Sequence, residues 1–181
     1  APVRPGGEKS LIELMEGVED IPGTALYEGM EWGSWETFPD YLDYIAGRQY
    51  SLDIGAQIAH GAVRYYVMGE RGADNEDATA DDLTEMARLV QEALVAGAVG
   101  FSTSRILLHK VPDGRHVPGT WAPIEEYVAV GEAMQAAGMS PTQVIESATR
   151  VGSLALGLQE TIGTIEAGKI ADLLVLEADP T

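Results

Sequence analysis

The 181-residue sequence contains no cysteine, which excludes disulfide bonds and thiolate metal sites. It is also poor in basic residues: lysine and arginine number 11 against 29 aspartates and glutamates, for a formal net charge of −18. A surface this acidic repels nucleic-acid phosphates and anionic lipid headgroups. We therefore expect neither a nucleic-acid partner nor a membrane partner.

Long hydrophobic runs are absent as well. No stretch approaches the roughly 20 apolar residues that a membrane-spanning helix needs. The first seven residues have neither the basic start nor the apolar segment of a secretory signal, so we expect a cytoplasmic protein. The apolar fraction of 45% and the length fit one ordinary domain with a hydrophobic core.

Several segments with helical periodicity each begin at a residue typical of a helix N-terminus. Apolar residues recur three or four positions apart in these segments, and Thr79 with Asp82 resembles a capping box. The predicted helices begin near Ser10, Thr37, Thr79, Pro123 and Ser140.

Three short apolar segments are predicted as strands, at residues 52–59, 98–101 and 170–176. Strands that alternate with helices favour βα units and a parallel sheet, so the predicted fold class is α/β. Two or three strands are too few to close a barrel of eight.

The order of several motifs resembles that of a known family. Residues 11–23 and 35–42 are similar to the N-acyl-D-amino-acid deacylase (D-aminoacylase) branch of the amidohydrolase superfamily. The matching segments continue at residues 60–64, 67–69, 100–105, 138–141, 148–149 and 156–158. Residues 162–173 resemble the return strand of the superfamily, so that together the motifs cover most of the chain.

The resemblance implies a (β/α)₈ barrel with an accessory β-sandwich, and metal-dependent hydrolysis of an amide bond, usually with zinc. In such an enzyme a metal-bound water of lowered pKa attacks the acyl carbonyl. On this basis we predict a partial TIM-type (β/α) barrel with parallel strands over residues 1–158. Residues 159–181 would return to the accessory β-sandwich through a C-terminal strand.

The metal ligands of the family have no counterpart in this sequence. Its first-strand His-x-His and its bridging cysteine would precede residue 1. The strands that carry its other histidines and its catalytic aspartate are skipped at a join within residues 132–138. The chain thus resembles an incomplete or internally deleted member, or a part of a larger molecule. Zinc is expected for the family, but this chain alone supports no metal ligand and no catalytic residue.

Polar residues that follow two of the predicted strands are the candidates for substrate binding, because barrel enzymes place functional groups there. They are His60, Arg64, Ser102, Ser104 and Arg105. Each has an alternative structural role: the histidine could pack under a loop, an arginine could form a salt bridge instead of binding a substrate carboxylate, and the serines could satisfy loop backbone groups. No base is expected beside a serine, and no Gly-x-Ser-x-Gly elbow is present.

Aromatic residues cluster at Trp32, Trp35 and Phe38. They could line a pocket for an apolar acyl group, or form core beneath a loop.

Two functions remain open. The chain could be a segment of a metal-dependent amidohydrolase that acts on a small-molecule amide, such as an N-acyl-D-amino acid. Alternatively, it could be a non-catalytic half-barrel that covers its open sheet edge with a protein partner, most simply a second copy in a homo-oligomer.

Overall fold

The computed structural model describes residues 1–19, 21–155 and 157–170. Contacts divide the chain into two compact units, residues 1–133 and residues 134–181. The boundary falls inside a helix, α7 (Ile124–Ala136), near its C-terminal end. The division predicted at residue 158 stays a prediction.

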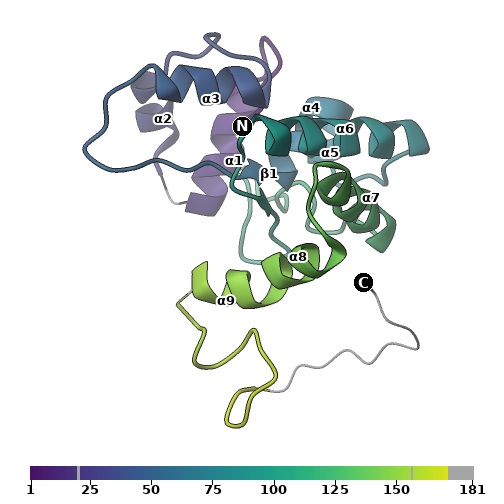
Figure 1. The fold of residues 1–181 in the computed structure, drawn as a ribbon. Helices are drawn as coiled ribbons and strands as arrows, with labels where there is room; N and C mark the ends of the chain where they lie inside the picture. The colour runs from purple at the N-terminus through teal and green to yellow at the C-terminus, as the bar shows by residue number, and fades with distance from the viewer. Residues whose placement is uncertain (20, 156, 171–181) are drawn as a thin grey trace. The chain divides into compact units, whose positions relative to one another are not determined.

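The first unit contains most of the regular structure (Figure 1). In chain order its elements are α1 (Glu8–Glu19), α2 (Gly23–Gly29), α3 (Phe38–Ala46), β1 (Ile58–Ala59), α4 (His60–Met68), α5 (Glu70–Ala73), α6 (Ala80–Ala96), β2 (Phe101–Ser102) and the start of α7. No helix within the described residues is long and apolar enough to span a membrane.

Strands β1 and β2 pair in parallel, with Ile58 opposite Phe101 and Ala59 opposite Ser102. The predicted parallel pairing is therefore confirmed, and the structure is a mixed helix and sheet fold. The predicted extent of the first strand is wrong, because only its last two residues are in the strand. Leu52 is 78% exposed, since no further strand within the described residues pairs with this segment.

Capping explains where α3 and α6 begin. Thr37 forms a capping box with Asp40 at α3, and Thr79 forms one with Asp82 at α6, so both predicted starts are confirmed. Helix α6 ends at Gly97, whose φ of +115° gives a left-handed C-terminus.

The predicted cap at Ser10 is wrong. Helix α1 already begins at Glu8, after a turn at Gly6, whose φ is +83°. The hydroxyl of Ser10 instead donates to the hydroxyl of Tyr65 at 2.8 Å. The structure also contains helices that the sequence pattern did not indicate, among them α2, α4 and α5.

The aromatic cluster belongs to the core of the first unit. Trp35 and Phe38 are 5% and 2% exposed, so the core interpretation is confirmed for these two residues. The Trp35 ring packs 5.5 Å from that of Trp32 and 4.7 Å from that of Tyr44, measured between centroids. Trp35 also belongs to a buried hydrophobic cluster whose other members are Val3, Leu11, Leu14, Ala62 and Val117.

The second unit begins with the end of α7 and continues with α8 (Pro141–Glu146), a π-helical turn (Ser147–Val151) and α9 (Gly152–Ala155). Ser140 caps α8 in a capping box with Gln143, as the Ser-Pro pair predicted. Residues 157–170 contain turns and no helix or strand. The predicted C-terminal strand at residues 170–176 lies, except for Ile170, outside the described residues.

Candidate functional site

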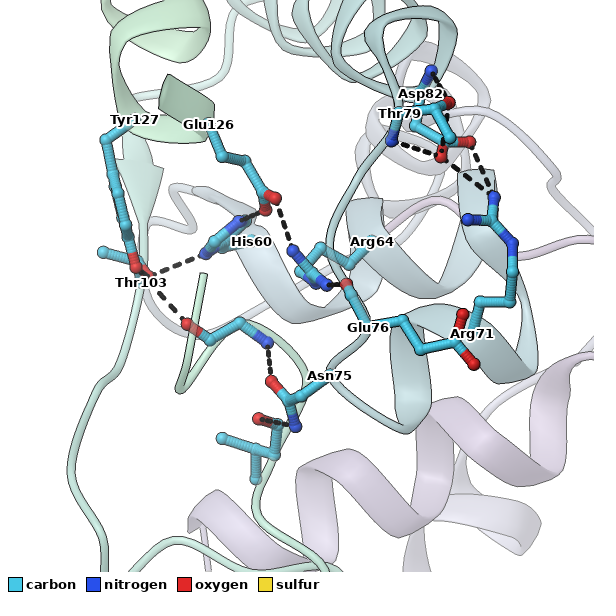
Figure 2. Close-up of polar contacts among 12 residues, drawn as sticks. His60, Arg64, Arg71, Asn75, Glu76, Thr79, Asp82, Thr103, Glu126 and Tyr127 are labelled. Carbon is cyan, nitrogen blue, oxygen red and sulfur yellow. Dashed lines mark hydrogen bonds and ion pairs between the residues drawn. The ribbon is translucent and has the colours of Figure 1, made fainter. Parts of the chain in front are cut away.

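The two parallel strands bring His60 and Thr103 together. Strand β1 ends one residue before His60, and β2 ends one residue before Thr103. Because parallel neighbours present their carboxyl ends at the same edge, the side chains that follow meet there. Nδ1 of His60 lies 2.9 Å from Oγ1 of Thr103 (Figure 2).

Two side chains of helix α4, those of His60 and Arg64, contact the same carboxylate. The two residues are one helical turn apart and therefore share a face of the helix. Nε2 of His60 lies 2.5 Å from Oε1 of Glu126, in the first turn of α7. Arg64 donates from Nη1 to the other carboxylate oxygen, and from Nη2 to the carbonyl of Glu76 at 2.5 Å. The side chains of His60, Arg64 and Glu126 are at most 2% exposed.

The charge of Glu126 is balanced inside the protein. Burial raises the pKa of this carboxyl, but the hydrogen bonds from His60 and Arg64 and the positive charge of Arg64 outweigh burial, and the net pKa is lowered. The group is therefore a carboxylate, which only accepts hydrogen bonds. This assigns a proton to Nε2 of His60, and in the neutral imidazole it leaves Nδ1 as the acceptor of the Thr103 hydroxyl.

A loop held by Asn75 covers the imidazole ring of His60. The amide nitrogen of Asn75 donates to the carbonyls of His116 and Val117 at 3.1 and 3.2 Å. Its amide oxygen accepts the backbone N–H of Gly119 at 2.8 Å. Gly119 in turn lies directly against the ring.

Tyr127 and Arg105 lie beside this network. The Tyr127 hydroxyl is 3.5 Å from Oγ1 of Thr103 and donates to the carbonyl of Gly119 at 3.4 Å. The guanidinium of Arg105 is 5.6 Å from the centroid of the Tyr127 ring, and its Nε donates to the carbonyl of Thr120 at 3.3 Å. Arg105 is exposed, and it forms no ion pair with any carboxylate in the described part of the chain.

The five candidate residues fall into two groups. His60 and Arg64 are buried around Glu126, whereas Ser102 and Ser104 are half-buried and Arg105 is exposed beyond β2. Ser104 lies 2.8 Å from Nδ1 of His109 and accepts the backbone N–H of Ile106 at 3.4 Å. The expectation that no base lies beside a serine is therefore wrong, since the chain turns back and brings His109 to Ser104, five positions earlier.

The sequence did not single out Glu126 as a partner of His60, and it gave Thr103 no role distinct from the neighbouring serines. Glu126 has a weak local signal, because acidic residues are common in the first turn of a helix. That signal does not say which side chain the carboxylate meets. Glu126 lies 66 residues from His60 in the sequence, and a local pattern cannot predict a contact over such a separation.

The described residues do not fit a metal site. Within residues 1–19, 21–155 and 157–170, no three histidine, aspartate or glutamate side chains converge as metal ligands. Both ring nitrogens of His60 are already hydrogen-bonded, to Thr103 and Glu126. A structural or catalytic zinc ion would need three or four protein ligands.

Two comparisons relate the chain to known proteins. The profile of the amidohydrolase family matches residues 123–181. A D-aminoacylase from Alcaligenes xylosoxydans xylosoxydans is 27% identical over 129 residues, which is 71% of this chain and 24% of that relative. The chain thus spans about a quarter of the length of the relative. No solved structure matches it significantly.

Proposed function

We propose that this chain binds the substrate of an amide hydrolase. The proposal starts from the amidohydrolase superfamily and its D-aminoacylase branch, an assignment that both matches support. The substrate class is N-acyl-D-amino acids or similar amides. The family assignment supports hydrolysis as the reaction class, and the site residues supply the argument for the substrate.

The guanidinium of Arg105, which has no ion-pair partner among the described residues, carries this proposal. An N-acyl amino acid has a carboxylate, which an arginine can bind through two parallel hydrogen bonds. Arg64 has no capacity for this, because its guanidinium already binds Glu126 and the carbonyl of Glu76. Among the described residues Arg105 donates from Nε, to the carbonyl of Thr120, and from neither terminal nitrogen, so both terminal nitrogens can bind a ligand carboxylate.

The remaining candidates have supporting roles in this proposal. Ser102 and Ser104 flank Thr103 at the end of β2 and offer hydroxyls to the amide of the substrate. His60 and Arg64 act indirectly, because both side chains are buried. His60 contacts the exposed Thr103, and Arg64 binds Glu126, which contacts His60. The zinc expected for the family would require ligands outside the described residues, and no step is assigned to it.

Binding of N-acetyl-D-methionine to the 181-residue protein tests this proposal. We expect saturable binding by isothermal titration calorimetry. It should be lost with the methyl ester of the same ligand, which has no carboxylate, and weakened roughly tenfold or more by Arg105→Gln. Arg150→Gln, at another exposed arginine, serves as the matched variant and should bind normally.

Hydrolysis is measured alongside binding. We expect no release of methionine by the chain alone with zinc, manganese or cobalt, because its described residues do not assemble a set of metal ligands. Chelator-sensitive release would overturn this part. If the methyl ester bound as well as the acid, and Arg105→Gln bound as well as the wild type, the assigned substrate contact would be overturned.

Self-association is a second candidate, favoured by exposed apolar side chains beside the two-stranded sheet. Leu52 and Val99 are 78% and 68% exposed, and a short open sheet invites pairing with another chain. In this function the second copy of the chain covers these residues. Sedimentation equilibrium should then show a dimer that Val99→Glu dissociates, whereas a wild-type monomer at micromolar concentration would exclude it.

A further inference from the structure

We propose that Thr103, His60 and Glu126 form an acyl-transfer site that needs no metal, with the Thr103 hydroxyl as the nucleophile. The site would accept small activated acyl compounds such as esters. A nucleophile bonded to a base, with the base oriented by a third group, is the arrangement that activates hydroxyl nucleophiles. Here the two contacts measure 2.9 Å, from Thr103 to His60, and 2.5 Å, from His60 to Glu126 (Figure 2).

The negative charge of Glu126 determines which group is the donor in each of these two hydrogen bonds. Since Glu126 is a carboxylate, it fixes the proton of His60 on Nε2 and leaves the lone pair of Nδ1 facing Thr103. Nδ1 is thus the base in contact with the hydroxyl. When Nδ1 takes the proton, the carboxylate 2.5 Å away stabilises the resulting imidazolium.

The surroundings hold this geometry in place. Arg64 satisfies the second oxygen of Glu126, so the carboxylate stays ionised although it is 1% exposed. The rings of Phe101 and Tyr127 each lie 5.4 Å from the His60 ring, measured between centroids. An imidazole fixed in this way cannot rotate away from the hydroxyl.

Thr103 alone of the three reaches solvent, so an acyl compound can meet the nucleophile while its base stays buried. The Tyr127 hydroxyl, 3.5 Å from Oγ1 of Thr103, is a donor for the oxyanion that forms on the attacked carbonyl. Its bond to Gly119 is long at 3.4 Å, and it can be exchanged for a bond to the acyl oxygen.

The reaction balances with an ester and water. Oγ1 of Thr103 bonds to the acyl carbon as its proton moves to Nδ1 of His60. The ester C–O bond then breaks, and the leaving oxygen takes the proton from His60 to form an alcohol or phenol. Water then attacks the acyl carbon while Nδ1 of His60 takes a proton from it. The bond between the acyl carbon and Oγ1 of Thr103 breaks, Oγ1 takes the proton back from His60, and a carboxylic acid is released.

A second hydroxyl–imidazole pair in the same loop provides an internal comparison. Ser104 and His109 are 2.8 Å apart, but in the described residues no carboxylate bonds to the other ring nitrogen of His109. If a hydroxyl beside an imidazole were sufficient, both residues would be acylated. We expect acylation of Thr103 and not of Ser104.

The test uses the full 181-residue chain with p-nitrophenyl acetate and EDTA. We expect one acetyl group per chain by intact mass, removable by hydroxylamine as an ester is and an acetylated lysine is not. Trypsin releases residues 89–105, and fragmentation of this peptide should place the acetyl group on Thr103. Thr103→Val should abolish the adduct, and Thr103→Ser should retain it. Thr24→Val removes another exposed threonine and should leave it unchanged.

Glu126 is tested as a positioning residue. Glu126→Gln should lower the maximal acylation rate roughly a hundredfold without changing the ester concentration at half-maximal rate, in protein whose circular dichroism shows it to be folded. Acetylation confined to lysines, an adduct on Ser104, or equal acylation of wild type and Thr103→Val would overturn the proposal. Because the reaction proceeds in EDTA and needs no ligand carboxylate, its failure leaves the Arg105 binding result intact.

Discussion

Gly119 lies so close to the imidazole of His60 that a Cβ atom on it would stand 2.7 Å from Nδ1. Its φ of +96° falls in the left-handed region that favours glycine. Asn75, itself at a φ of +59°, accepts the N–H of Gly119 at 2.8 Å. Two left-handed residues joined by one hydrogen bond therefore fix the loop over the histidine.

Because of this contact, we predict that Gly119→Ala lowers the free energy of unfolding by more than its backbone strain alone would. Gly114, with a φ of +90° and nothing within 4 Å of its Cβ position, is the matched control. We expect Gly119→Ala to lower the free energy of unfolding by about 1–3 kcal/mol more than Gly114→Ala, because the methyl group overpacks the ring. Urea denaturation measures the difference. Equal losses would show that the ring can move aside.

The buried pair of Arg64 and Glu126 predicts strong coupling. Arg64→Met leaves a buried carboxylate without its cation, and Glu126→Gln leaves a buried guanidinium without its anion. Each should cost about 3–5 kcal/mol of unfolding free energy, and the double variant should cost clearly less than the sum. Arg88→Met, at an exposed ion pair with Glu92, should cost no more than about 1 kcal/mol. Additive losses at Arg64 and Glu126 would contradict the coupling.

Local signals predicted the helix starts well. Thr37, Thr79 and Ser140 each bond to a backbone N–H three residues ahead, and such a contact can be recognised within four residues of sequence. The parallel pairing of β1 and β2 could also be predicted, because a helical crossover that includes the 17-residue α6 connects the strands. Both features depend on the order of nearby residues.

The contacts of the site could not be predicted in this way. His60 meets Thr103 and Glu126 at separations of 43 and 66 residues, and tertiary packing decides such pairs. Helix α4 itself was missed, since its sequence contains Gly61 and Val63, which are poor helix formers. The candidate list therefore included Arg64 but could not show that its guanidinium is bound to a buried carboxylate.

The cap of α6 predicts a measurable loss of stability. Thr79 accepts the N–H of Asp82, whose carboxylate accepts the N–H of Thr79 and also binds Arg71 at 2.9 Å. Thr79→Ala should lower the free energy of unfolding by about 1 kcal/mol, while Thr79→Ser should retain most of it. Thr84→Ala is the control, because its hydroxyl only bonds to the carbonyl of Ala80 within the same helix. A greater loss at Thr84 in thermal unfolding would contradict the cap.

The last prediction concerns pH. Burial raises the pKa of Glu126, but the hydrogen bonds from His60 and Arg64 and the positive charge of Arg64 hold its folded value below the 4.5 of an unperturbed glutamate. If the pKa of a carboxyl is lower in the folded chain than in the unfolded chain, its ionisation stabilises the fold. This stabilisation is fully present at a pH above the pKa of the unfolded chain. That stability is lost as the pH falls through the folded value.

Unfolding free energies measured from pH 6 down to about pH 3 should therefore fall more steeply for the wild type than for Glu126→Gln, which cannot titrate at this position. Glu125→Gln removes an exposed carboxylate from the same helical turn and should keep a slope close to that of the wild type. Other carboxylates, Asp82 among them, have a lowered pKa and leave a residual slope in every variant. Identical slopes for wild type and Glu126→Gln would mean that the carboxylate gains nothing from His60 and Arg64. The tautomer on which the Thr103 reaction depends would then lose its support.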